Sequence, residues 1–179
     1  GLKKPLLKKF NLSLLLAGVT LTGFSGTALA NTNGVKHTPQ HSKQWVHKKW
    51  VHEKWLNNHT QFKCLVDTVY HETRGEPVRG QVAVANVVLN RIEDERFPDT
   101  PCSVMNQKGQ FAFVGKGYKI QEKDAYAQSK RIVEGVLKGK YKDYSKDSVF
   151  FNSSHKSPAK SAKFVTRIGG HSFYASNVK

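Results

Sequence analysis

The chain has 179 residues, of which 38% are hydrophobic, and this is enough for one modest core. It carries 29 lysines and arginines against 13 aspartates and glutamates, a formal net charge of +16 at pH 7. This balance excludes an acidic or charge-neutral protein, and it requires either an anionic partner or a solvated cationic face. Basicity alone favours the cationic face over a specific site.

The first thirty residues have the pattern of a secretory leader. They open with four lysines: Lys3, Lys4, Lys8 and Lys9. An uncharged apolar run follows over residues 10–24, and Ala28-Leu29-Ala30 is the small-x-small pattern that signal peptidase cuts. The apolar run is shorter than the ~20 residues that a spanning helix needs. We therefore expect residues 1–30 to be a signal peptide, export to the periplasm or cell envelope, and no stable membrane span.

Export changes how the charge and the cysteines are interpreted. Nucleic acid becomes a poor partner, and anionic envelope polymers or a membrane surface become better ones. The chain has only two cysteines, and an even pair in an exported protein is more often bridged than free. We expect a Cys64–Cys102 disulfide, worth about 4 kcal/mol. It would tie the start of the first core helix to the segment after the second one.

Residues 31–60 form a basic arm that contains most of the histidines. Trp45, Trp50 and Trp55 recur every five residues, which fits neither the helical period of 3.6 nor the strand period of two. We interpret the arm as a linker whose tryptophans dock on the domain; the alternative is an aromatic, cationic strip that stacks on sugars or anions. No histidine spacing recurs with the usual zinc ligands, so we expect neither a metal nor a cofactor.

Residues 61–179 contain the expected globular domain, which begins with two helices. Five apolar side chains recur at i, i+3, i+4, i+7 and i+8 and so share one helix face: Phe62, Leu65, Val66, Val69 and Tyr70. Gly75 and Pro77 end this helix. Residues 81–92 are so apolar that they predict a second helix that is buried on most sides.

The second half of the domain predicts shorter elements and a hairpin. We expect a helical turn over residues 102–106 and a third helix over residues 124–138, with Gly139 just past its end. Gly169-Gly170 separates two strand-like runs, which is a hairpin signal. The sequence therefore predicts a mainly helical α+β domain with a small C-terminal β-hairpin.

Two carboxylates lie at the break between the first two helices. Glu72 ends the first helix, and Glu76 follows past a glycine. A carboxylic acid among apolar neighbours loses hydration, which raises its pKa and allows it to donate a proton near neutrality. Cleavage of a glycosidic bond demands such an acid. Glu76 either faces the same cleft or forms an ion pair with Arg74 or Arg79.

Three runs carry a resemblance to a known family: Tyr70-His71-Glu72-Thr73-Arg74-Gly75-Glu76-Pro77, residues 80–85 and residues 88–91. They resemble the signature of the spore-cortex-lytic family of cell-wall hydrolases. Further matches follow in order, at residues 96–98, 102–104, 110–111 and 168–174. The similarity covers nearly all of residues 64–174, and the cysteine pair resembles the version found in Gram-negative bacteria and their phages.

The resemblance implies a lysozyme-like catalytic domain whose substrate is the glycan strand of peptidoglycan. It implies cleavage between N-acetylmuramic acid and N-acetylglucosamine by a lytic transglycosylase, with Glu72 as the single acid/base and Glu76 as a supporting residue at the substrate site. Five more residues match positions that line the family's substrate groove: Gln110, Phe111, His171, Phe173 and Tyr174. Each has an alternative role: the aromatic side chains could pack in the core, the glutamine could hold the backbone by hydrogen bonds, and the histidine could form a hydrogen bond in the hairpin.

Two departures from the family pattern leave alternatives open. Thr73 stands where members often have alanine, and Pro158 is followed by Ala159 where tryptophan is common, which weakens a sugar-stacking wall. The alternatives are a hydrolytic muramidase and a non-catalytic, cationic peptidoglycan-binding protein. A cell-wall amidase would need a metal or a cysteine nucleophile, and the sequence offers no convincing set of either. We expect a monomer.

Overall fold

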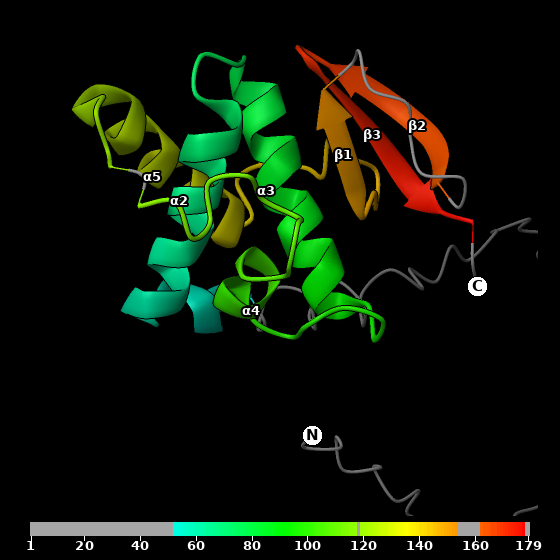
Figure 1. Ribbon diagram of the computed structural model, residues 1–179, viewed down its shortest axis with the longest axis horizontal. Coiled ribbons are helices and arrows are strands. Elements are labelled where there is room, and N and C mark those ends of the chain that lie inside the picture. The colour runs from blue at the N-terminus through cyan, green and yellow to red at the C-terminus, as the bar shows by residue number, and fades with distance from the viewer. Residues whose placement is uncertain (1–51, 118, 154–161, 178–179) are drawn as a thin grey trace, which may run out of the picture. The chain divides into compact units, whose positions relative to one another are not determined.

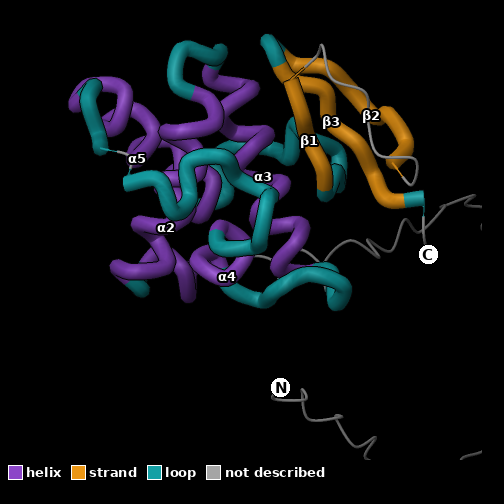
Figure 2. Tube along the Cα trace, in the orientation of Figure 1, coloured by secondary structure: helices purple, strands orange, loops and turns teal. Residues whose placement is uncertain are grey.

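The structure is a computed structural model that describes residues 52–117, 119–153 and 162–177. Residues 52–56 are helical. The elements that follow are α2 (His59–Thr73), α3 (Val78–Glu93), α4 (Pro101–Met105), α5 (Lys123–Leu137), β1 (Phe150–Ser153), β2 (Ala162–Ile168) and β3 (His171–Ser176). The helices gather on one side and the strands form a separate layer beside α3 (Figures 1 and 2). The expected signal peptide and most of the expected arm lie outside the described residues.

Helix α3 is the centre of the core. Every residue from Gly80 to Leu89 is buried, as the apolar run predicts. One side of α3 joins the larger cluster, which contains Leu65 and Val69 of α2 and Val133 of α5. The other side, with Val84 and Val87, packs against Phe173 of β3 in a smaller cluster. Since burial of each such side chain stabilises the fold by about 1.5–3 kcal/mol, α3 is the scaffold that both layers share.

Local signals set the ends of the helices. The Asn58 side chain accepts a hydrogen bond from the backbone N–H of Gln61 and so caps α2. Thr100 caps α4 in the same way, with Pro101 in the first turn. Helix α5 ends just before Gly139, which has a φ of +70°. Glycine adopts this left-handed conformation without steric cost, so its position correctly predicted the end of the helix.

The sheet has three antiparallel strands in the order β1-β3-β2. The predicted hairpin is present: Ile168 pairs with His171 across the Gly169-Gly170 turn. Strand β1, whose Phe151 pairs with Phe173, was not predicted from the sequence. β1 is only four residues long and has no alternating pattern, so its conformation depends on pairing with β3.

Cys64 and Cys102 form the predicted disulfide. Their Cα atoms are 5.1 Å apart. The bond joins α2 to α4, and the loop of chain that it closes contains all of α3. The same junction contains a hydrogen bond from the backbone N–H of Cys102 to Gln61 Oε1, at 2.9 Å. The described part of the chain contains no other cysteine.

The packed part of the chain begins before residue 61. Trp55 is 4% exposed and belongs to the larger core cluster, so this tryptophan docks on the domain as expected of the arm. Trp45 and Trp50 lie outside the described residues. Within the part of the chain that the structure describes, no helix has both the length and the apolar character needed to cross a membrane.

Candidate active site

Glu72 lies in the last turn of α2 and lines a cavity of about 320 Å³. We call this cavity the acid pocket. It is formed by the end of α2, the turns after α4 and the segment that leads into α5: His71, Glu72, Arg74, Ala112, Phe113, Lys119 and Gln121. Glu72 is half-buried and is the one carboxylate among these lining residues. Glu72 thus lies at the end of the helix, as the sequence predicts, and there it lines the acid pocket.

Buried Tyr70 fixes the far wall of the acid pocket. Its hydroxyl accepts hydrogen bonds from the backbone N–H groups of Gln121 and Glu122, at 3.2 and 3.1 Å, and from Arg74 Nη1 at 3.3 Å. These donors, the Glu122 N–H above all, hold the pKa of Tyr70 below its usual value of 10.0. The segment before α5 is therefore anchored to α2 two residues away from Glu72.

The neighbouring carboxylates on the helical side have other partners. Asp67 Oδ1 accepts from the Tyr126 hydroxyl at 2.9 Å, and Asp67 Oδ2 pairs with Lys63 Nζ at 2.5 Å. Glu122 Oε1 is 3.3 Å from Arg74 Nη1. Neither Asp67 nor Glu122 lines the acid pocket.

Glu76 fastens the hairpin turn of the sheet to the loop between α2 and α3. Its Oε2 accepts from the backbone N–H of Gly170 at 2.9 Å, and its Oε1 is 3.9 Å from His171 Nδ1. A Cβ atom on Gly169 would lie 2.0 Å from Oε2, so this approach requires glycine. We call this arrangement the Glu76 latch. Its partners are the turn and His171 rather than Arg74 or Arg79.

The other predicted groove residues are not among those that line the acid pocket. Phe173 is fully buried, and Phe111 and Tyr174 are 5% and 6% exposed, so all three pack in the core, which was their alternative role. Gln110 is exposed in a turn after α4, and His171 is half-buried at the start of β3. None of the five lines the acid pocket, and their contact with substrate stays a prediction.

A row of rings connects the acid pocket to the Glu76 latch. His71 stacks on Phe113 with centroids 4.5 Å apart, Phe113 lies 6.1 Å from Phe111, and Phe111 lies 6.4 Å from Phe151. Phe151 is in turn 5.5 Å from His171. Phe113 and Phe151 were not among the site residues predicted from the sequence. The aromatic spacing Phe111-x-Phe113 was a signal for the first, whereas Phe151 lies in the strand that was not predicted.

The two histidines at the ends of this row predict a loss of stability on acidification. Burial lowers the pKa of both His71 and His171 below the usual 6.5, although the charge of Glu76 partly offsets the shift at His171. Below pH 6.5 the unfolded chain binds protons that the folded chain does not yet bind, so the free energy of unfolding falls as the pH drops through this window.

Urea unfolding above and below pH 6.5 checks this dependence. We expect the double variant His71→Gln, His171→Gln to show a smaller change than the wild type. An unfolding free energy that rises on acidification would contradict the assignment.

The family model described as Cell Wall Hydrolase matches residues 75–174, more than half of the chain. The chain therefore belongs to the cell wall hydrolase family. The match begins just after Glu72. The family predicted from the sequence motifs is confirmed.

Curated relatives cover a limited part of the chain. A spore cortex-lytic enzyme from Oceanobacillus iheyensis is 47% identical over 53 residues, which are 30% of this chain and 19% of the relative. One from Halalkalibacterium halodurans is 40% identical over 75 residues, which are 42% of this chain and 22% of the relative. The chain spans about a fifth of the length of the curated relatives it matches.

Two solved structures share the fold over most of their length. The catalytic domain of the Bacillus cereus SleB protein is 28% identical with a TM-score of 0.51, and the match covers 64% of this chain and 88% of that one. The catalytic domain of a germination-specific lytic transglycosylase from Bacillus anthracis is 27% identical with a TM-score of 0.53, covering 65% and 94%. These likenesses confirm the predicted mainly helical, lysozyme-like α+β fold.

Proposed function

We propose that this chain is a peptidoglycan-degrading enzyme that cleaves the glycan bond between N-acetylmuramic acid and N-acetylglucosamine as a lytic transglycosylase. The observation that carries the proposal is the position of Glu72 at the end of α2, where it is the one carboxylate among the described residues that line the acid pocket. Membership of the cell wall hydrolase family supports it, as does the likeness to a catalytic domain described as a lytic transglycosylase.

In the proposed reaction Glu72 acts first as an acid and then as a base. It donates its proton to the glycosidic oxygen, and the bond between that oxygen and the muramic anomeric carbon breaks. The resulting carboxylate takes the proton of the muramic 6-hydroxyl, whose oxygen bonds to the anomeric carbon and forms a 1,6-anhydro end. Glu72 regains its proton, so one residue serves both steps.

The positions of the other carboxylates favour this single-acid reaction. A retaining glycosidase needs a second carboxyl group about 5 Å from the first as nucleophile, and an inverting one needs a second as base. Asp67 and Glu122 are paired with cations, and Glu76 accepts a hydrogen bond from the hairpin turn. In transglycosylation the substrate's own hydroxyl replaces the second carboxylate or the water.

The location and the wider contacts of the enzyme are part of the proposal. We propose action in the periplasm or cell envelope, with the basic surface attracted to anionic envelope polymers. Gln110 is the exposed member of the predicted groove residues and so the best placed to reach a glycan. The structural role of Phe173 in the core does not require substrate contact.

Mass spectrometry of soluble muropeptides from purified sacculi tests the proposed reaction. The proposal predicts 1,6-anhydro ends. Reducing ends would instead identify a hydrolytic muramidase. If the wild type releases nothing yet sediments with sacculi, the chain is a cationic peptidoglycan-binding protein.

The Glu76 latch predicts a difference between two substitutions of one residue. Glu76→Gln keeps an oxygen that can accept from the Gly170 N–H, whereas Glu76→Ala removes it. We expect the alanine variant to lose about tenfold in kcat, because the loop that follows Glu72 loses its anchor to the hairpin turn, and the glutamine variant to stay within a few fold.

Hydrogen exchange at the Gly170 amide provides an independent measurement of the latch. Protection should be lost in Glu76→Ala and retained in Glu76→Gln. If both variants were equally inactive while protection persisted in both, Glu76 would have to act on the substrate itself.

A further inference from the structure

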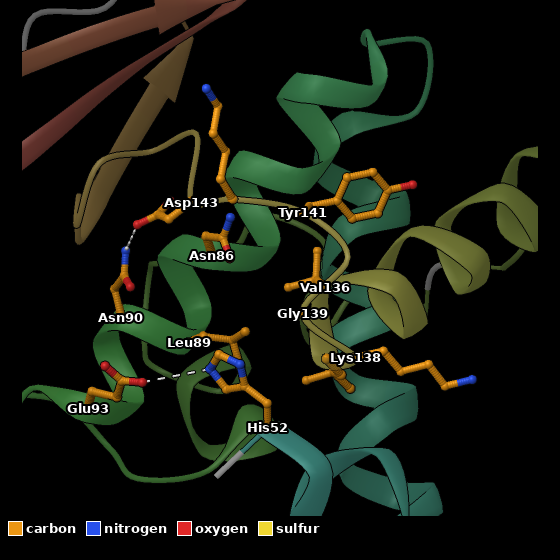
Figure 3. Close-up of a pocket in the computed structure, with 12 residues that line it drawn as sticks. His52, Asn86, Leu89, Asn90, Glu93, Val136, Lys138, Gly139, Tyr141 and Asp143 are labelled. Atoms are coloured by element: carbon orange, nitrogen blue, oxygen red, sulfur yellow. Dashed lines mark hydrogen bonds and ion pairs between the residues drawn. The ribbon is translucent and has the colours of Figure 1, made fainter. Parts of the chain in front are cut away.

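A second cavity lies at the other end of α5 from the acid pocket. Its volume is about 430 Å³, within the range of about 300–1,000 Å³ that is typical of small-ligand sites. We call it the α3–α5 cavity; Asn86 to Glu93 of α3 bound one side, and Val136 to Gly139 and the loop after them bound the other (Figure 3). It shares no lining residue with the acid pocket. The acid pocket lies by the segment that leads into α5, and the second cavity lies by the end of this helix, which is roughly 20 Å long at about 1.5 Å of rise per residue.

Two buried nitrogen atoms on the wall of the α3–α5 cavity, one from Asn86 and one from His52, have no hydrogen-bond partner among the described residues. Asn86 is 7% exposed, and its Nδ2 makes no hydrogen bond. Figure 3 shows Asn86 on the cavity wall, facing the loop that carries Tyr141 and Asp143. His52 Nε2, across the cavity, also makes no hydrogen bond and is 3.7 Å from Glu93 Oε1. A buried N–H group without an acceptor is destabilising and uncommon, so an entering oxygen atom would complete the site.

A second asparagine one turn along α3 makes the wall rigid. Asn90 Nδ2 donates to Asp143 Oδ2 at 3.1 Å and to the backbone oxygen of Ser148 at 3.1 Å (Figure 3 draws the first). Asp143 Oδ1 also accepts from the backbone N–H of Ser145 at 2.7 Å. The loop is thus held in place by groups that already have partners, and the opening at Asn86 is preformed.

The charges around the cavity select a neutral ligand. The wall carries two carboxylates, Glu93 and Asp143, and two ammonium groups, Lys138 and Lys142, so its formal charges cancel and favour neither an anion nor a cation. Lys138 is paired with Glu134, so this cation does not require a negative ligand. An uncharged oxygen acceptor is the group that fits the Asn86 amide.

The remaining wall is apolar and aromatic. Leu89 and Val136 are 2% and 3% exposed and line the cavity. The Tyr141 ring, 36% exposed, lies against α5 at Gly135, where a Cβ atom would come within 2.6 Å of it. An acetamido group offers a carbonyl oxygen to Asn86 and a methyl group to the apolar wall, and a sugar ring can pack on tyrosine.

We propose that the α3–α5 cavity binds an N-acetylated amino sugar, so that the domain holds a glycan strand at a second place outside the acid pocket. The choice of sugar rests on the proposed function, whereas the cavity and its unpartnered donor do not. A second contact on the same polymer is intramolecular once the first has formed, so even weak affinity increases occupancy on sacculi. The second contact does not increase the occupancy of a fragment that is too short to reach both sites.

Titration of the full chain with tri-N-acetylchitotriose, followed by ¹H–¹⁵N NMR, tests the site directly. The chain carries Glu72→Gln so that binding is read without cleavage. We expect shifts at the Asn86 side-chain amide and at Leu89 and Gly139, and about tenfold weaker binding in Asn86→Ala. Tyr141→Ala, at an exposed side chain, should also weaken binding, while Asn106→Ala, outside both cavities, should not.

Three results would overturn the proposal: no shift at the cavity residues, equal binding of the de-N-acetylated trimer, or unchanged affinity in both the Asn86 and Tyr141 variants. In catalytically active chain, Asn86→Ala should slow digestion of intact sacculi and leave cleavage of short fragments unchanged. Failure of the proposed function would appear separately, as no muropeptide release by the wild type, and the titration would still report on the cavity.

Discussion

Glu72→Gln is expected to lower the release of soluble muropeptides from purified sacculi by about 10²–10⁴-fold. Glutamine keeps the size of the side chain but has no proton to give to the glycosidic oxygen and no carboxylate to take one from the muramic 6-hydroxyl. No other carboxylate lines the acid pocket among the described residues, so none can substitute. Rates of muropeptide release, quantified by liquid chromatography, measure the effect.

A matched control separates loss of the acid from loss of a nearby charge. Glu122→Gln changes a carboxylate that lies beside Arg74 but outside the acid pocket, and it should retain most of the activity. Both variants should sediment with sacculi as the wild type does. A Glu72→Gln variant with activity within tenfold of the wild type would remove Glu72 from the reaction.

Removing the disulfide is expected to lower the free energy of unfolding by about 4 kcal/mol. Cys64 and Cys102 are 38 residues apart, and the loop that they close contains all of α3. Without the bond the unfolded chain gains conformational freedom, while the folded chain keeps its core. Because small domains are stable by only about 5–15 kcal/mol, the loss is large.

Urea unfolding of the double variant Cys64→Ala, Cys102→Ala measures this contribution. A reducing agent should destabilise the wild type by a similar amount and leave the double variant unchanged. Since neither cysteine lines the acid pocket, activity at low temperature should persist. A loss of less than about 1 kcal/mol in the free energy of unfolding would contradict this prediction. It would mean that strain in the bonded folded state cancels most of the stabilisation.

Features of local origin could be predicted from the sequence. The apolar faces of α2 and α5, the continuous apolar run of α3 and the Gly169-Gly170 turn each leave a periodic or glycine signal within a few residues. The disulfide followed from cysteine number and the expected export. The position of Glu72 at the end of α2 followed from the glycine and proline after it.

Features that depend on distant pairing could not be predicted. The Glu76 latch joins residues 94 positions apart, and nothing around Glu76 indicates that its carboxylate accepts from Gly170. Arg91 interrupts the apolar helix α3, yet it is buried: its Nε donates to the backbone oxygen of Val149 at 2.6 Å, and burial lowers its pKa to about 10. The rings of Phe97, Phe111 and Phe150, which belong to other segments, lie around its guanidinium. The residue pattern within α3 does not predict these contacts.

The central claim is that Glu72 alone performs the acid and base steps, and that Glu76 supports the site through the sheet. Its most direct test compares the soluble muropeptides released from one batch of sacculi by the wild type, Glu72→Gln and Glu76→Gln. We predict 1,6-anhydro products from the wild type and from Glu76→Gln, and none above background from Glu72→Gln. Anhydro products from Glu72→Gln at the wild-type rate, or their absence only in Glu76→Gln, would contradict the claim.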